Sequence, residues 1–143
     1  MTTLALTAAQ VAEFLSREFP QVSDNFVIDR ITPEETVVRM VIDERHLRPG
    51  GTVSGPAMFA LADISFYVAI LARIGPIGLA VTTNANIDFL RKPAAGVDLV
   101  ATATLLKVGK VLAVGEAHIR NPGSPDVVAR ASMTYSIPPR GER

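Results

Sequence analysis

One stretch of this sequence, from Gly55 to about residue 73, limits most strongly what the chain can fold into. Its residues are apolar with little interruption, and a helix that is apolar nearly all round is a buried one. Ser54 suits the N-cap position and Pro56 fits the first turn of a helix, while Gly75 and the proline after it end it. The fold must therefore enclose one long helix.

Strand-like segments supply the cover for this helix. Runs of alternating or β-branched apolar residues predict strands over residues 25–31, 36–42, 79–90, 97–108, 110–120 and 126–137. The loops between the later strands are short, which predicts an antiparallel meander. A sheet of this length must curl round the helix to cover it, so the sequence indicates an α+β fold. A short amphipathic helix over residues 7–19, with Thr7 as its N-cap, precedes the sheet.

The length of 143 residues suits a single domain, residues 1–143, with a core of its own. We expect residues 1–24 to form an N-terminal helical segment and residues 138–143 to form a frayed polar tail. A net charge of zero gives no electrostatic attraction for nucleic acid. The apolar share of 48% indicates that apolar surface is buried between subunits, so we expect a homo-oligomer.

The composition also excludes several kinds of chemistry. The sequence contains no cysteine, which removes disulfides, thiolate chemistry and cysteine-ligated zinc. Its two histidines, His46 and His118, are far apart in the sequence, so no metal site is predicted. The N-terminus lacks the features of a secretory signal. The apolar run of residues 57–72 is shorter than the roughly 20 residues of a membrane span. We therefore expect a cytoplasmic protein that does not enter a membrane.

Asp63 is the outstanding polar residue, because a carboxylate in an apolar helix costs free energy unless it is paired, hydrogen-bonded or functional. One interpretation is structural, in which Asp63 caps a neighbouring loop or forms an ion pair with Arg48 or Arg73. The other is catalytic, because Gly55 presents a backbone N–H at the positive end of the helix and lets a ligand oxygen approach closely. Such a donor and a carboxylate two turns on suit acyl transfer, with the donor stabilising an oxyanion and the carboxylate activating water or attacking the carbonyl.

At these positions the sequence resembles the PaaI-like acyl-CoA thioesterases of the hotdog superfamily. Their signature is His-Gly-Gly, six residues, and an Asp or Glu on the central helix. Ser54, Gly55 and Pro56 stand on the first three positions and Asp63 on the last. The strand at residues 86–93 and the turns at 96–98 and 108–110 also resemble the family, and the resemblance covers about residues 25–137. It implies a hotdog fold, in which a curved antiparallel sheet wraps a long central helix.

The resemblance implies a hydrolase that cleaves acyl-CoA or acyl-carrier thioesters at a dimer interface. Asp63 would act as general base or nucleophile, the Gly55 N–H would bind the thioester oxygen, and Thr82 of the partner chain would position water. No cofactor is implied beyond the coenzyme A of the substrate, and the subunits are expected to form a homodimer or a tetramer of two dimers. The residues expected to bind substrate are Arg48, Thr83, Asn84, Arg91, Lys92 and Lys110. Ordinary strand composition and solvated surface remain alternative explanations for these threonines and cations.

The sequence departs from the family signature at two positions. Ser54 replaces the histidine and could hydrogen-bond in its place. Pro56 replaces the second glycine and has no N–H, so an oxyanion hole must rest on Gly55 and Ala57. Two alternatives to an enzyme therefore stay open: a non-catalytic hotdog protein that binds an acyl ligand, and a structural dimer module without a ligand.

Overall fold

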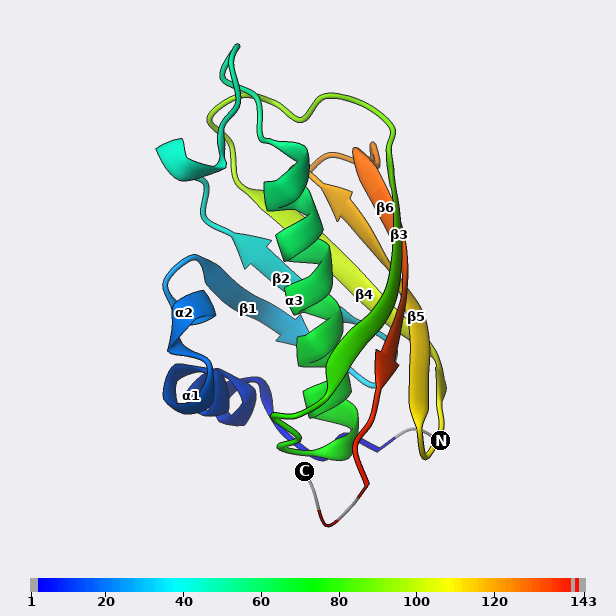
Figure 1. Ribbon diagram of the computed structural model, residues 1–143. Coiled ribbons are helices and arrows are strands. Elements are labelled where there is room, and N and C mark those ends of the chain that lie inside the picture. The colour runs from blue at the N-terminus through cyan, green and yellow to red at the C-terminus, as the bar shows by residue number, and fades with distance from the viewer. Residues whose placement is uncertain (1–2, 140, 142–143) are drawn as a thin grey trace.

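The computed structural model describes residues 3–139 and 141. Helix α3 (Gly55–Ile74) lies at its centre, against the concave side of a six-stranded antiparallel sheet (Figure 1). The Ser54 hydroxyl caps the helix by accepting the N–H of Ala57 at 3.3 Å. Gly75 ends it with a φ of 107°, a conformation that favours glycine. The predicted buried helix is confirmed.

The six strands form one curved sheet in the order β1-β2-β4-β5-β6-β3. The predicted antiparallel meander is confirmed for β4, β5 and β6. It is wrong for β3, which pairs with β6 at the edge of the sheet and not with β4. Residues 90–98 connect β3 at the edge of the sheet to β4, which pairs with β2. Both β2 and β4 pack against α3. The strands are β1 (Phe26–Ile31), β2 (Thr36–Met40), β3 (Val81–Phe89), β4 (Leu99–Val108), β5 (Leu112–Arg120) and β6 (Ala129–Ser136).

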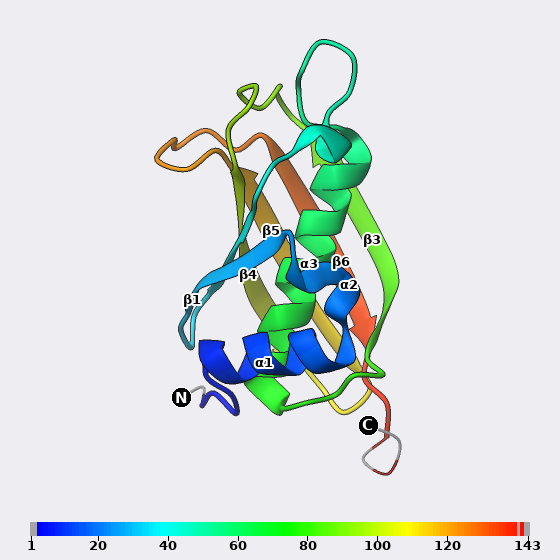
Figure 2. The same ribbon diagram turned by 90° about the vertical axis from the view of Figure 1, so that its left-hand side faces the viewer.

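Two helices precede the sheet, α1 (Ala8–Glu18) and α2 (Pro20–Ser23), and both pack beside β1 (Figure 2). The predicted cap of α1 is confirmed, because the Thr7 hydroxyl accepts the N–H of Gln10 at 3.2 Å. Helix α2 was not predicted from the sequence. Pro20 marks the end of α1, but its fixed φ also suits the first turn of a new helix, and α2 begins there.

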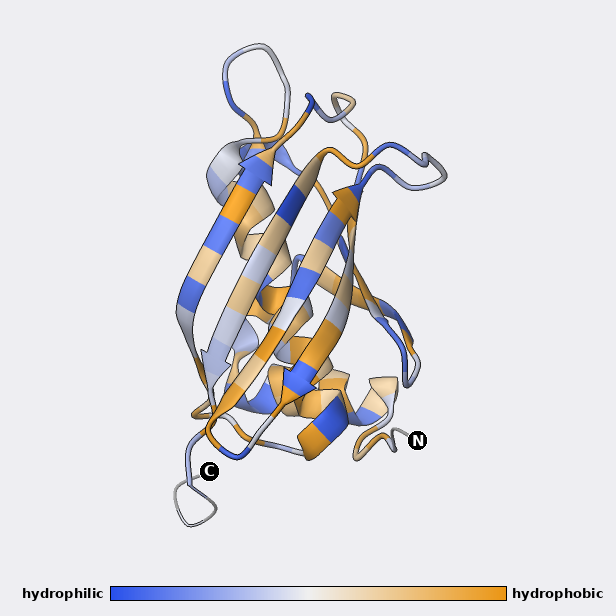
Figure 3. Cartoon of the chain, turned by 90° about the vertical axis from the view of Figure 1, so that its right-hand side faces the viewer, coloured by the Kyte–Doolittle hydropathy of each residue, from blue (hydrophilic) through white to orange (hydrophobic). Residues whose placement is uncertain are grey.

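Residues of the sheet alternate between the core and the outer face. Figure 3 shows the accompanying alternation of hydrophobic and hydrophilic residues along the strands. In β6 the side chains of Ala131, Met133 and Tyr135 are buried, whereas Ser132 and Thr134 between them are half-buried on the outer face. The inward side chains and α3 form one apolar core. This alternation decides which residues of each strand can reach the helix.

Helix α3 is long and apolar enough to cross a membrane by length and composition, so the expectation of a run too short for a span is wrong. Of its most apolar window, 72% is buried inside the chain, which makes it a core helix. A 3-10 turn, Glu44–His46, interrupts the loop before α3. The predicted fraying of residues 138–143 falls partly outside the described residues.

Candidate functional site

Asp63 is half-buried on a helix whose neighbouring residues are buried, and two hydroxyl groups bind it. The Thr82 hydroxyl donates a hydrogen bond to Asp63 Oδ1 at 2.6 Å, and the Tyr135 hydroxyl donates one to the same oxygen at 2.8 Å. We call Asp63, Thr82 and Tyr135 the acid cluster. Among the described residues Asp63 forms no ion pair, so the structural interpretation that paired it with Arg48 or Arg73 is wrong.

The register of two strands brings the acid cluster together. Thr82 of β3 lies directly opposite Tyr135 of β6 in the sheet, and directly paired residues point to the same face. The register shifts immediately after Thr82, which leaves Thr83 without a paired residue. Thr82, Ala85 and Ile87 are therefore the partly buried residues of β3, while the others are exposed.

Burial strongly affects the chemistry of Tyr135. Its side chain is 3% exposed, and its ring packs against those of Phe66 and Tyr67, with centroid distances of 5.3 and 6.0 Å. Burial first, and the charge of Asp63 second, raise the pKa of Tyr135 far above its usual value. The hydroxyl therefore keeps its proton near neutral pH and acts as a donor to the carboxylate.

Tyr135 is the member of the acid cluster that sequence reasoning missed. The strand pattern places it on the inward face, but it gives no indication of which residue receives its hydroxyl hydrogen bond. The available signal was the residue type, because a buried tyrosine requires a partner for its O–H. Asp63, the one acid on the apolar helix, was a candidate for that partner.

Thr82 contacts Asp63 within one chain, whereas the resemblance implied that this threonine acts from the partner subunit. Thr83 and Asn84 do not join the acid cluster. The Thr83 hydroxyl donates to the backbone oxygen of Thr134 at 3.3 Å, and Asn84 is exposed and pairs with Thr134, which lies on the outer face. A role for Thr83 and Asn84 in binding substrate stays a prediction.

The start of α3 leaves one backbone donor free. Pro56 has no N–H, and the N–H of Ala57 is already bound by the Ser54 hydroxyl. Among the described residues the Gly55 N–H donates no hydrogen bond. Ser54 is held in turn by the backbone oxygen of His46, which accepts the Ser54 N–H at 2.7 Å. Of the two N–H groups that the sequence suggested for an oxyanion hole, those of Gly55 and Ala57, the Gly55 N–H is the one available to a ligand.

A cleft of about 600 Å³ opens beside the start of α3. Three cations line it, Arg48 from the loop before the helix and Arg91 and Lys92 from the segment after β3, and their side chains are exposed. We call it the cationic cleft; its lining also includes Gly55, Met58 and Phe89. Three of the four cations expected to bind substrate thus lie together, around the free N–H of Gly55.

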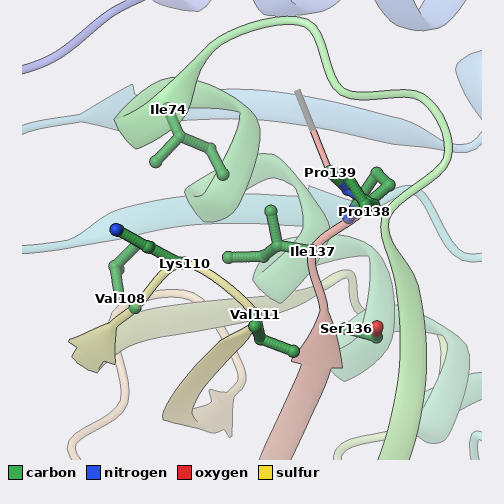
Figure 4. A pocket seen from close by; sticks show the side chains of 9 residues that line it. Ile74, Val108, Lys110, Val111, Ser136, Ile137, Pro138 and Pro139 are labelled. Carbon is green, nitrogen blue, oxygen red and sulfur yellow. The ribbon is translucent and has the colours of Figure 1, made fainter. Parts of the chain in front are cut away.

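Lys110 does not lie at the cationic cleft. It lines a larger cavity, of about 990 Å³, between the end of α3 and the hairpin that joins β4 to β5 (Figure 4). Ile74, Val111 and Ile137 line the same cavity and make it mostly apolar. Neither Asp63 nor Gly55 lines it, so this cavity lies away from both candidate catalytic groups. Within one chain, Lys110 is separated from the other cations.

Gly55 and Asp63 cannot serve one carbonyl group within a single chain. They are eight residues apart on one helix, and a rise of 1.5 Å per residue separates them by about 12 Å along its axis. A general base and an oxyanion donor must both lie within hydrogen-bond reach of the reacting group, about 3 Å. The residues that the sequence selected therefore form two half-sites in each chain.

In the described part of the chain, no group of three or more His, Asp or Glu residues is arranged to hold a metal ion. His46 is used structurally, because its Nδ1 accepts the backbone N–H of Asp43 at 2.9 Å. His118 lies on the outer face of the sheet, 3.6 Å from a carboxylate oxygen of Glu116. Both histidines thus have partners within the protein.

Comparison with known proteins identifies the family. Residues 50–135, more than half of the chain, match the model of the family described as the thioesterase superfamily. This chain belongs to that superfamily. The human protein "Acyl-coenzyme A thioesterase 13" is 26% identical over 140 residues, which cover 96% of this chain and 99% of that protein.

Solved structures show the same fold. The crystal structure of a "putative thioesterase" from Silicibacter sp. TM1040 is 50% identical, covers 96% of each chain and superposes with a TM-score of 0.90. The Escherichia coli PaaI protein from the phenylacetic acid degradation operon is 26% identical over 92% of this chain and 93% of its own, with a TM-score of 0.78. The resemblance to PaaI-like hotdog thioesterases is therefore confirmed, and the relatives support thioester hydrolysis as the activity.

Proposed function

We propose that this protein hydrolyses acyl-CoA thioesters, in a site that two copies of the chain form together. The observation that carries the proposal is Asp63, a carboxylate in a core helix with no ion pair among the described residues and with one oxygen held by two hydroxyl groups. The curated relatives supply the substrate class, since one of them is named an acyl-coenzyme A thioesterase. No cofactor is needed beyond the coenzyme A of the substrate.

The separation of Gly55 from Asp63 supports a composite site. Strand β3 is an edge strand of nine residues, and the side chains of Val81 and Phe89 at its ends are 55% and 51% exposed. A long edge strand presents unpaired N–H and C=O groups, which are a ready template for pairing with another chain. A second copy that pairs there would bring the start of its own α3 toward Asp63. A homodimer then holds two equal sites, each with the acid of one chain and the N–H of the other.

The chemistry follows from these two half-sites. Asp63 takes a proton from water while the water oxygen bonds to the thioester carbonyl carbon, or Asp63 itself attacks that carbon. The carbonyl oxygen becomes an oxyanion, which the Gly55 N–H stabilises at the positive end of α3. The carbon–sulfur bond then breaks. In the general-base route the sulfur leaves as a thiol with the proton that Asp63 took from water, whereas in the route with attack by Asp63 it leaves as a thiolate, which takes a proton from solvent. A covalent intermediate, if Asp63 attacks, is cleaved by water in a second step.

The cationic cleft suits the other half of the substrate. Coenzyme A carries several phosphate groups, and Arg48, Arg91 and Lys92 provide positive charge at the mouth of the cleft. These side chains are exposed, so their attraction for phosphate is screened by salt. We expect them to contribute to binding of the substrate and little to the chemical step.

The test is turnover on a panel of medium-chain, long-chain and aromatic acyl-CoAs, with Asp63→Ala measured beside the wild type. We expect hydrolysis of at least one member and a loss of roughly two orders of magnitude or more in the variant, as for a lost catalytic group. Circular dichroism checks that the variant is folded.

Full activity of Asp63→Ala would contradict the mechanism. Calorimetric binding of an acyl-CoA without turnover on any member would instead identify a binding protein, the rival that Ser54 and Pro56 suggest. Neither binding nor turnover would leave a structural dimer module. Sedimentation measurements report whether the chain forms the dimer that the composite site requires.

A further inference from the structure

We infer that Tyr135 is a positioning residue for Asp63, which holds the carboxylate through Oδ1 and leaves Oδ2 as the oxygen that reacts. This inference rests on the proposed function and deepens it, because it selects one atom of the acid and gives a role to a residue outside the family signature. The acid cluster carries the inference, through two short hydrogen bonds that end on the same oxygen.

The two oxygens of Asp63 have different surroundings. Oδ1 accepts the hydroxyl of Thr82 at 2.6 Å and that of Tyr135 at 2.8 Å. Among the described residues, none donates a hydrogen bond to Oδ2. Asp63 is half-buried, and no buried side-chain polar atom in the described part of the chain lacks a partner. Oδ2 is therefore the oxygen with free lone pairs, available to a water molecule or to the substrate.

Tyr135 is better placed than Thr82 to fix the carboxylate. Its ring is buried between the rings of Phe66 and Tyr67, so its hydroxyl has little freedom to move. Thr82 lies on the edge strand β3 and is only partly buried. The Tyr135 hydroxyl also lies 3.3 Å from the backbone oxygen of Asp63, which places it against the helix itself. A rigid donor from the core thus orients a carboxylate that faces the edge of the sheet.

Two donors on Oδ1 have a chemical consequence. Hydrogen bonds to a charged carboxylate are stronger than those between neutral groups, and they stabilise the ionised form. The acid therefore points one fixed oxygen toward the reacting group, which is the condition for efficient proton transfer or attack. Removing one donor should slow the chemical step and leave the binding of coenzyme A unchanged.

The experiment compares Tyr135→Phe with Tyr67→Phe. Both variants keep an aromatic ring in the same stack and lose one hydroxyl, but the Tyr67 hydroxyl lies near the backbone oxygen of Gly78, at 3.3 Å, and not near Asp63. We expect Tyr135→Phe to lower kcat about tenfold with KM within about twofold, the size of a lost hydrogen bond to a charged group. Tyr67→Phe should keep kcat within about twofold. Equal kcat values in the two variants would overturn the inference.

A second measurement does not depend on turnover. Carbon-13 NMR of labelled aspartate detects the Asp63 carboxyl carbon, assigned by its absence in Asp63→Asn. In Tyr135→Phe the chemical shift of this carbon, recorded at neutral pH, should change because Oδ1 has lost a hydrogen-bond donor. The Tyr67 ring packs on Tyr135, but its hydroxyl donates to the backbone oxygen of Gly78, so Tyr67→Phe should leave the chemical shift in place. An unchanged chemical shift in Tyr135→Phe would overturn the inference.

These results separate the two proposals. If the wild type hydrolyses no member of the panel, or if Asp63→Ala keeps full activity, the proposed function fails, and the chemical shift of the Asp63 carboxyl carbon still decides whether Tyr135 holds the carboxylate. If the wild type is active, Asp63→Ala is inactive and Tyr135→Phe behaves like Tyr67→Phe, the positioning role fails alone. Thr82→Val removes the other donor to Oδ1 and should lose severalfold in kcat.

Discussion

The acid cluster and the cationic cleft both include residues of α3, but they are built in different ways. In the acid cluster, Asp63 is fixed by hydroxyl groups from β3 and β6, and one of these, on Tyr135, is almost fully buried. In the cationic cleft, exposed side chains extend from two loops, and the Arg91 side chain donates a hydrogen bond to the backbone oxygen of Val127 at 3.1 Å. Packing fixes the position of the carboxylate in the acid cluster, whereas the cationic cleft offers positive charge to a ligand. Substitutions in the first should therefore change kcat, and those in the second KM.

The largest expected effect belongs to Asp63→Asn. The amide oxygen still accepts hydrogen bonds from both hydroxyls, so the fold is kept, but the side chain can no longer act as a base. We expect kcat to fall by about two orders of magnitude or more, with KM nearly unchanged. Asp88→Asn is the matched control: Asp88 is exposed and pairs with Arg130 at 2.9 Å, so its kcat should be unchanged. A comparable loss of kcat in Asp63→Asn and Asp88→Asn would contradict the catalytic role of the acid cluster.

Gly55→Ala tests the link between the two regions. A Cβ at this position would lie 3.3 Å from Cζ of Phe89, a close contact that the half-exposed ring can relieve by shifting. The new methyl group lies beside the free N–H, and we expect kcat/KM to fall about tenfold, less than the loss of an oxyanion donor itself. Steady-state kinetics of Gly55→Ala/Phe89→Leu provide the check. The loss should persist in this double variant; full recovery would assign it to the displaced ring.

Neutralising the cationic cleft should raise KM severalfold and leave kcat unchanged. The test is Arg91→Ala and Lys92→Ala on an acyl-CoA and on an acyl-pantetheine thioester, which lacks the nucleotide phosphates. We expect the effect on the acyl-CoA alone, and it should shrink with added salt because exposed charges are screened. Lys110→Ala is the control, since Lys110 lines a different cavity. An equal rise of KM on both substrates would exclude phosphate recognition by these residues.

The smallest expected effect is that of Ser54→Ala. It removes the cap of α3 and should lower the free energy of unfolding by about 1 kcal/mol, as for other N-cap hydroxyls. Because the N–H of Gly55 stays in place, kcat should change by less than about threefold. Thr7→Ala removes the equivalent cap of α1 and should cost similar stability, measured by urea unfolding, without any effect on kcat. A large loss of kcat in Ser54→Ala alone would give the hydroxyl a direct catalytic role.

Much of the fold could be predicted because its signals are local. The cap and the ending of α3, the amphipathic face of α1 and the alternation in β6 each depend on neighbouring residues. The position of β3 could not be predicted, because two antiparallel neighbours were equally compatible with its pattern. Helix α2 was missed because Pro20 both ends one helix and starts the next.

The candidate site was predicted only in part. Asp63 and Gly55 stood out because each is unusual at its position in an apolar helix, and three of the predicted cations do lie together in the cationic cleft. Lys110 lies in a different cavity, because the hairpin that carries it is at the other end of α3. Tyr135 is 72 residues from Asp63 in the sequence, and no local pattern connects them.

The sequence by itself determined that one apolar helix is enclosed by a sheet and that this helix carries a single acid. Periodicity and capping act over a few residues, so they can be read directly from the chain. Only the tertiary structure decided what the acid contacts, because the pairing of β3 with β6 sets which hydroxyls reach Asp63. The separation of the acid from the Gly55 N–H is different, because it follows from their eight-residue spacing and the rise of the helix, so the sequence determined it together with the helix. This separation is why a second copy enters the proposed mechanism.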